Sequence, residues 1–278
     1  MTHTRWLSPA SLAIVVAIGC GGGTPRDASA TTERATQRDE DSAPLRLAEA
    51  PPGMEAGQPA AAKAGAVGKG SIAGTAKLAG QPPAPQPVKM DADPVCQQQH
   101  ATGMASEEVV ADNGMLKNVF VYVKEGVSGS FPTPTAPVAL EQSGCWYHPH
   151  VFGLQVNQPL EIVNSDATLH NVNAKPSVNQ PFNVAQPVKG MKTAKKFAKP
   201  EVMVRFKCNV HPWMSAYAGV VAHPFFSVSG QDGSFAIANL PDGTYVIEAW
   251  HEKYGTQTQT VTVSGGETKK IELTFKAQ

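Results

Sequence analysis

One short loop in this sequence carries three side chains that bind metals. Cys208, His211 and Met214 are spaced as C-x-x-H-x-x-M, directly after residues 202–206, in which apolar residues alternate as in a strand. The loop therefore offers a thiolate, an imidazole and a thioether. Soft sulfur ligands combined with imidazole favour copper, zinc or iron over the hard cations.

A second imidazole stands earlier in the chain. His170 follows an apolar run at residues 160–163 and a polar turn at residues 164–169. One thiolate, two imidazoles and a weak axial thioether make up the type 1 copper site, a ligand set that serves both Cu(I) and Cu(II). The sequence thus predicts one mononuclear type 1 (blue) copper ion held by His170, Cys208, His211 and Met214.

The residues around these ligands resemble the cupredoxin family, closest to its plastocyanin-type and amicyanin-type members. The resemblance covers roughly residues 136–220 and rests on a short list of motifs: Tyr147-His148-Pro149, the turn with Asn164 and Asp166, His170 followed by Asn171, and the cysteine loop. It implies a Greek-key β-sandwich whose copper ligands fall on the four residues named above. It also implies that Asn171 hydrogen-bonds beside the copper and tunes the site.

The flanking sequence predicts more β-structure. Short alternating runs are separated by Gly, Pro, Asn and Asp, and no stretch keeps a helical period, so the expected fold class is all-β. Residues 70–80, 116–123, 232–237, 240–249 and 269–275 resemble the strands of a carboxypeptidase regulatory-like sandwich, which is of the immunoglobulin or transthyretin kind. We expect one such sandwich formed by residues 70–129 and 223–278, with a cupredoxin domain at 130–222 inserted into it. The alternative is two consecutive domains with a strand extension on the copper fold.

The N-terminus has the features of a bacterial lipoprotein signal. Arg5 precedes an apolar run at residues 12–18, and Ala17-Ile18-Gly19 lead into Cys20. The run is shorter than the roughly 20 residues of a membrane-spanning helix. We therefore expect a signal peptide at residues 1–19, a lipid on Cys20 and a location in the cell envelope, anchored to a membrane and facing the periplasm or the exterior. An ordinary signal peptide with a chance cysteine is the alternative. Residues 20–69 are poor in aromatic and β-branched residues and predict a disordered tether.

The remaining cysteines have two interpretations. With Cys20 acylated and Cys208 on copper, Cys96 and Cys145 are left to form a disulfide in an oxidising compartment. The competing interpretation is a second metal site, because Cys145, His148 and His150 lie close together in sequence.

Composition and motifs limit the function. The formal net charge is +0, which argues against nucleic acid as a partner, and the sequence has no recognisable catalytic motif. We expect a protein that is not an enzyme and carries single electrons between redox proteins of the periplasm or membrane. A copper storage or delivery protein, or a binding scaffold with structural copper, are the alternatives.

The sequence also indicates roles for several other basic residues and histidines. Lysines are frequent between Lys175 and Lys207, which predicts either a face that attracts an acidic redox partner or an ordinary solvated face. His223 and His251 are expected to hydrogen-bond between domains. A single H-x-H pair, His148 and His150, is too little for a multicopper oxidase.

Overall fold

A computed structural model describes residues 64–277 of the chain. The predicted signal peptide, the lipid site at Cys20 and most of the predicted tether lie outside these residues. In the described part, strands dominate and the expected all-β fold class is confirmed. Between residues 64 and 277, no helix has the length and apolar character needed to cross a membrane.

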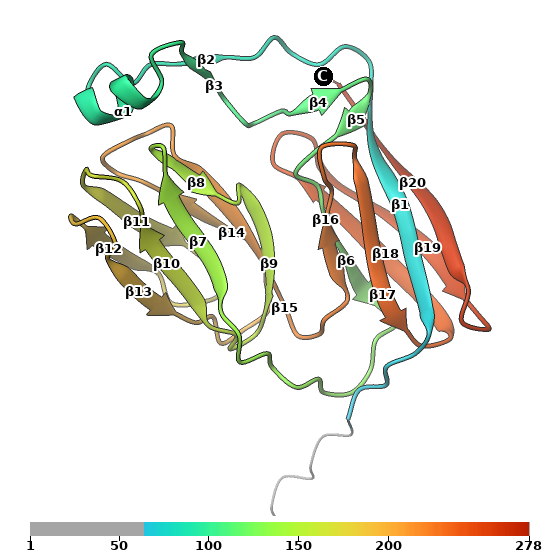
Figure 1. The fold of residues 1–278 in the computed structure, drawn as a ribbon. Helices are drawn as coiled ribbons and strands as arrows, with labels where there is room; N and C mark the ends of the chain where they lie inside the picture. The colour runs from blue at the N-terminus through green and yellow to red at the C-terminus, as the bar shows by residue number, and fades with distance from the viewer. Residues whose placement is uncertain (1–63, 278) are drawn as a thin grey trace, which may run out of the picture. The chain divides into compact units, whose positions relative to one another are not determined.

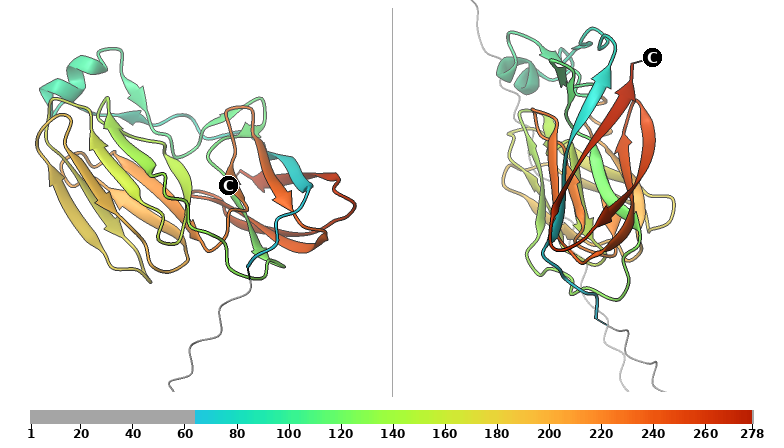
Figure 2. Two further views of the ribbon diagram at one scale, coloured as in Figure 1. Left: turned by 60° about the horizontal axis from the view of Figure 1, so that its bottom comes forward. Right: turned by 90° about the vertical axis from the view of Figure 1, so that its right-hand side faces the viewer.

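One pair of sheets, here called the outer sandwich, takes strands from both ends of the described chain. Its first sheet contains β1 (Gly70–Ala79), β4 (Ala111–Asp112), β5 (Met115–Leu116), β17 (Ser234–Leu240) and β20 (Thr268–Lys276). Its second sheet contains β6 (Phe120–Glu125), β16 (Phe226–Val228), β18 (Gly243–His251) and β19 (Gly255–Val263). The strands β1 and β20 run parallel side by side, as Figures 1 and 2 show, although they are far apart in sequence.

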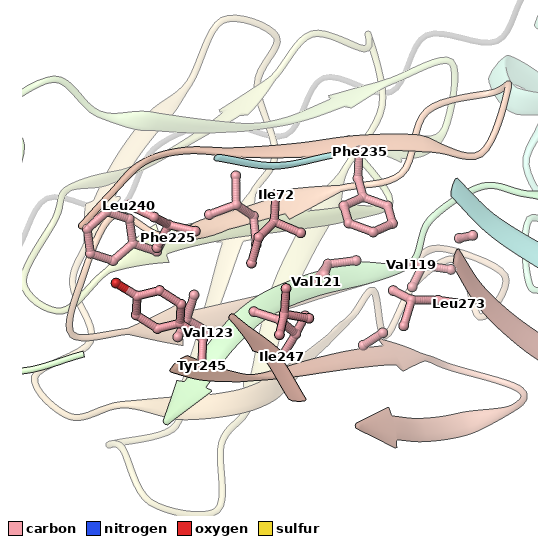
Figure 3. Packing of buried hydrophobic residues seen from close by; sticks show 14 of the residues in the cluster. Ile72, Val119, Val121, Val123, Phe225, Phe235, Leu240, Tyr245, Ile247 and Leu273 are labelled. Atoms are coloured by element: carbon pink, nitrogen blue, oxygen red, sulfur yellow. The ribbon is translucent and has the colours of Figure 1, made fainter. Parts of the chain in front are cut away.

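The core of the outer sandwich lies between these two sheets. Figure 3 shows Ile72, Phe235 and Leu240 of the first sheet facing Val121 and Ile247 of the second. Buried and exposed side chains largely alternate along β17 and β18, as expected for strands with one face on the core. Apolar burial is thus the main source of stability for this sandwich.

The second pair of sheets, here called the middle sandwich, is formed by residues that follow β6 and precede β16 (Figure 1). One sheet contains β7 (Val138–Ser143), β8 (Trp146–His148), β10 (Leu160–Asn164) and β13 (Lys192–Lys195). The other contains β9 (Val151–Gln155), β11 (His170–Lys175), β12 (Phe182–Gln186), β14 (Glu201–Lys207) and β15 (Ser215–Val221). The core between these sheets contains side chains that are at most 1% exposed, among them Leu140, Ile162, Phe197 and Phe206.

Residues 80–110, here called the cap segment, connect β1 to β4 and lie at one end of the middle sandwich (Figures 1 and 2). The cap segment contains β2 (Pro87–Val88), α1 (Pro94–Gln99) and β3 (Met104–Ala105). Helix α1 begins after Asp93, whose side chain accepts hydrogen bonds from the amides of Val95 and Cys96, with Pro94 in the first turn. An N-capping aspartate followed by proline is a favourable helix start.

The two sandwiches pack against each other through a small apolar cluster. Phe120 of β6 is fully buried against Val151 of β9 and Val221 of β15, with Phe226 at its side. The contact joins the second sheet of the outer sandwich to the five-stranded sheet of the middle sandwich.

Candidate metal centre

The cysteine loop connects two paired strands of the middle sandwich. Lys207 at the end of β14 pairs with Ser215 at the start of β15, so residues 208–214 form a closed loop at the sheet end. Within it, the Cys208 amide donates to the Met214 carbonyl (3.2 Å) and the Met214 amide donates to the His211 carbonyl (2.9 Å). These bonds turn the loop back on itself and bring its three candidate ligands to one place.

His170 reaches the same place from the neighbouring strand. It is the first residue of β11, which pairs with β14, and the turn before it is fixed by Asn164. The Asn164 Oδ1 accepts from the Asp166 amide (2.9 Å), and its Nδ2 donates to the Thr168 carbonyl (3.0 Å). A buried asparagine whose side chain satisfies the turn backbone explains why this turn has a defined shape.

The nitrogen and sulfur atoms of three predicted ligands converge. The Nδ1 atoms of His170 and His211 are 2.9 Å apart, and the Cys208 Sγ lies 3.8 Å from the His211 Nδ1. One ligand atom from each of these three residues lies within 4.8 Å of the others. All three side chains are at most 3% exposed. Burying polar atoms this deeply costs folding free energy unless they form hydrogen bonds or bind a metal.

Met214 completes the predicted set by position. Its side chain is fully buried and belongs to the same apolar cluster as Cys208. Its assignment as the axial ligand stays a prediction.

Each imidazole is held from behind by a carboxylate. The His170 Nε2 lies 2.8 Å from Asp166 Oδ2, and the His211 Nε2 lies 2.9 Å from Asp93 Oδ2. A carboxylate on Nε2 keeps a proton there, so Nδ1 is the ring atom that would bind a metal. Both histidines therefore turn their Nδ1 atoms toward each other and toward Cys208.

Asn171 lies beside the thiol. Its Oδ1 accepts from the Asn209 amide (2.6 Å) and from the Cys208 thiol (3.4 Å). The His211 amide also donates to Cys208 Sγ (3.4 Å). Asn171 thus connects β11 to the cysteine loop.

The electrostatics favour the ionised form of the sulfur. Burial alone would raise the pKa of Cys208, but hydrogen bonds from His170 and His211 lower this pKa from 9.0 to about 6. Burial acts against the charged form of His170, yet hydrogen bonds to Asp166 and Cys208 raise its pKa to about 9. The site is therefore set up to hold a thiolate, which is the form that binds metals.

These residues fit a copper ion by the chemistry of their donor atoms. Two imidazole Nδ1 atoms and one thiolate, with a buried thioether nearby, match the trigonal set of a type 1 site. Oxygen-preferring cations would find no suitable donors among these three converging groups.

Comparison with known proteins gives structural neighbours for part of the chain. No family model and no curated protein matches the sequence. Solved structures similar to part of the chain include small copper proteins. They include a variant of amicyanin in its Cu(I) form, with 17% sequence identity, a TM-score of 0.27 and coverage of 30% of this chain and 81% of that chain. A purple cupredoxin from Nitrosopumilus maritimus has 18% identity, a TM-score of 0.26 and coverage of 31% and 98%.

An enzyme is also among these neighbours. A copper-containing nitrite reductase from Thermus scotoductus has 24% identity and a TM-score of 0.27, and the match covers 36% of this chain but only 25% of the reductase. At such scores the likeness is no evidence of function, which depends on the site itself.

The predicted disulfide between Cys96 and Cys145 is present. It excludes the competing metal site, because the Cys145 sulfur is bonded to Cys96 and offers no thiolate. His148 is exposed, with its Nε2 3.2 Å from the Ser143 carbonyl, while His150 pairs with Glu252 of the outer sandwich.

The other two histidines do not bridge the sandwiches as expected. His223 Nε2 contacts the carbonyl of Val123 in β6 (2.8 Å), and His251 Nδ1 accepts from the Lys253 amide (3.1 Å). Both contacts lie within the outer sandwich. The histidine that pairs across the two sandwiches is His150, through Glu252, and the sequence analysis did not predict this contact.

The basic residues between Lys175 and Lys207 are divided between two sheets. Lys192 and Lys195 lie on β13 of the four-stranded sheet, whereas Arg205 and Lys207 lie on β14 of the five-stranded sheet. Some already have partners: Lys192 pairs with Glu161 (3.0 Å), and the Arg205 guanidinium lies over the Tyr217 ring (5.8 Å). An acidic redox partner stays a prediction.

Proposed function

We propose that this chain is a type 1 copper protein that transfers single electrons between redox proteins of the bacterial cell envelope. The observation that carries the proposal is the convergence of three buried donor atoms, His170 Nδ1, His211 Nδ1 and Cys208 Sγ. When bound, the copper would supply a one-electron couple between Cu(I) and Cu(II).

The protein residues would keep the site rigid through that change. His170 is fixed by Asp166 and by the turn around Asn164, and His211 by Asp93. Cys208 is held by Asn171 and by the His211 amide. Because each ligand has a second partner in the protein, the donor atoms need little rearrangement when the charge changes, which favours fast electron transfer.

The burial of the donor atoms supports the proposal of a role without substrate chemistry. His170, Cys208 and His211 are almost fully buried, so a substrate has no direct route to the donor atoms in the described structure. We therefore propose that the chain is not an enzyme. A disulfide supports export to an oxidising compartment, and lipid attachment at Cys20 is part of the proposal.

The experiment is to load the protein with copper and record its reduction potential and its electron exchange with an external redox dye. Reversible one-electron reduction without metal loss supports electron carriage. Irreversible reduction, or release of the metal on reduction, would instead favour storage or delivery of copper. A Cys208→Ser variant is the matched control, since it keeps a similar shape and removes the soft thiolate.

A further inference from the structure

The cap segment provides a residue to the metal centre from outside the middle sandwich. Asp93 belongs to the connection between β1 and β4, yet its Oδ2 lies 2.9 Å from His211 Nε2 and accepts from Thr168 Oγ1 (2.8 Å). Its Oδ1 accepts from the amides of Val95 (2.8 Å) and Cys96 (3.2 Å). Four donors thus fix one carboxylate, which is a strongly constrained arrangement.

The same segment closes the outer edge of His211. This histidine is only 1% exposed, and the Cys96 Sγ lies 3.6 Å from its Nε2. Trp213 covers another side, with ring centroids 5.0 Å apart, and its indole nitrogen donates to the Cys145 carbonyl (3.0 Å). His211 is therefore enclosed by the cap segment and by the residues to which that segment is bonded.

Several contacts fasten the cap segment over the site. The disulfide joins Cys96 to Cys145, His100 Nε2 contacts the Gly144 carbonyl (2.6 Å), and Met90 packs with Trp146 and Trp213. All of these contacts join the cap segment to residues of the middle sandwich.

The disulfide also connects the two carboxylates that hold the histidines. Asp93 accepts from the Cys96 amide, while Asp166 Oδ2 accepts from the Cys145 amide (2.7 Å). The backbone amide of each disulfide cysteine thus donates a hydrogen bond to the carboxylate that holds one of the two imidazoles. A displacement of the bridge would disturb both Asp–His pairs together.

We propose that the cap segment is a working part of the metal centre: Asp93 positions His211, and the segment encloses the site so that copper is exchanged with solvent only when the segment opens. The proposal rests on the copper site described above. It adds a positioning residue and a barrier to metal exchange that the four ligands alone do not contain.

The test compares Asp93→Asn with Asp91→Asn in the full chain loaded with Cu(I). Asparagine is as good an N-cap as aspartate, so Asp93→Asn keeps the start of α1 but removes the carboxylate behind His211. Asp91 is exposed and carries the same charge two positions away. Because partners behind a ligating histidine commonly contribute 10- to 100-fold to metal binding, we expect Asp93→Asn to speed copper transfer to a coloured Cu(I) chelator by about 10- to 100-fold. Asp91→Asn should transfer copper at the wild-type rate.

A second measurement does not depend on copper. In the metal-free protein, the His211 Nε2 proton should give a slowly exchanging ¹⁵N-resolved NMR signal, which Asp93→Asn should lose and Asp91→Asn should keep. Equal transfer rates in all three proteins, or an unchanged His211 signal in Asp93→Asn, would overturn the inference. If the wild type binds no copper through Cys208, the proposed function fails, while the NMR result still decides whether Asp93 positions His211.

Discussion

The ring of Phe120 in the outer sandwich lies directly over Gly219 in the middle sandwich. A Cβ atom built on Gly219 would lie 2.2 Å from the tip of that ring, which is closer than real Cβ contacts allow. Glycine is needed here because of the close approach of a buried ring. The two sandwiches therefore meet through a ring on one side and a missing side chain on the other.

We expect Gly219→Ala to destabilise the protein by about 1 to 3 kcal/mol, because the added methyl group overpacks a buried contact. Urea unfolding measures the effect. Adding Phe120→Leu to Gly219→Ala should cost less than the sum of the two single changes, since the smaller side chain makes room. Additive costs would show that the two residues do not share the contact.

The axial role of Met214 makes a prediction about the reduction potential. Met214→Leu keeps the buried apolar volume but removes the thioether sulfur. We expect the variant to bind copper and to have a higher reduction potential, because losing a weak axial donor disfavours Cu(II). Cyclic voltammetry checks the potential, and an unchanged value would rule out axial ligation by this residue.

The disulfide makes a prediction about stability. Cys96 and Cys145 are 49 positions apart, and closing a loop of that length contributes about 4 kcal/mol in the chain-entropy model. The double variant Cys96→Ala/Cys145→Ala should lose approximately this much free energy of unfolding, measured by urea titration of the metal-free protein. A loss much below 1 kcal/mol would contradict a stabilising bridge.

His251 makes the stability depend on pH. Burial, and repulsion from His150, lower the pKa of His251 from 6.5 to about 4, and its Nδ1 is already used as an acceptor by the Lys253 amide. The unfolded chain therefore binds this proton first as the pH falls. Stability is unaffected above pH 6.5 and decreases between about 6.5 and 4, by about 3 kcal/mol in total from this residue.

His251→Asn is the variant that isolates this effect. Asparagine keeps an acceptor atom near the position of Nδ1 but has no titratable group. The difference in free energy of unfolding between pH 7 and pH 4.5 should be smaller in the variant than in the wild type. The same difference in both proteins would assign the acid sensitivity to other groups.

Much of the architecture was predictable because it depends on local patterns. Alternating apolar residues predicted strands such as β1 and β6, and cysteine parity predicted the disulfide. The order of ligand types in the cysteine loop likewise pointed to the residues that converge on one another. These signals are contained within a few neighbouring residues or in a simple count.

The role of Asp93 was not predictable in this way. Its partner His211 lies 118 positions away, and the only local signal is the Asp93-Pro94 pair, which indicates a helix start. Which side chain such a helix faces is decided by tertiary packing. The same holds for His150 and Glu252, which are brought together by the docking of the two sandwiches.

The visible absorption spectrum of the oxidised, copper-loaded protein tests the central claim most directly. If Cys208 binds copper as a thiolate beside His170 and His211, the wild type should show an intense charge-transfer band near ~600 nm, and Cys208→Ser should lose it. A copper-loaded wild type without such a band, or a band that persists in Cys208→Ser, would contradict the type 1 site.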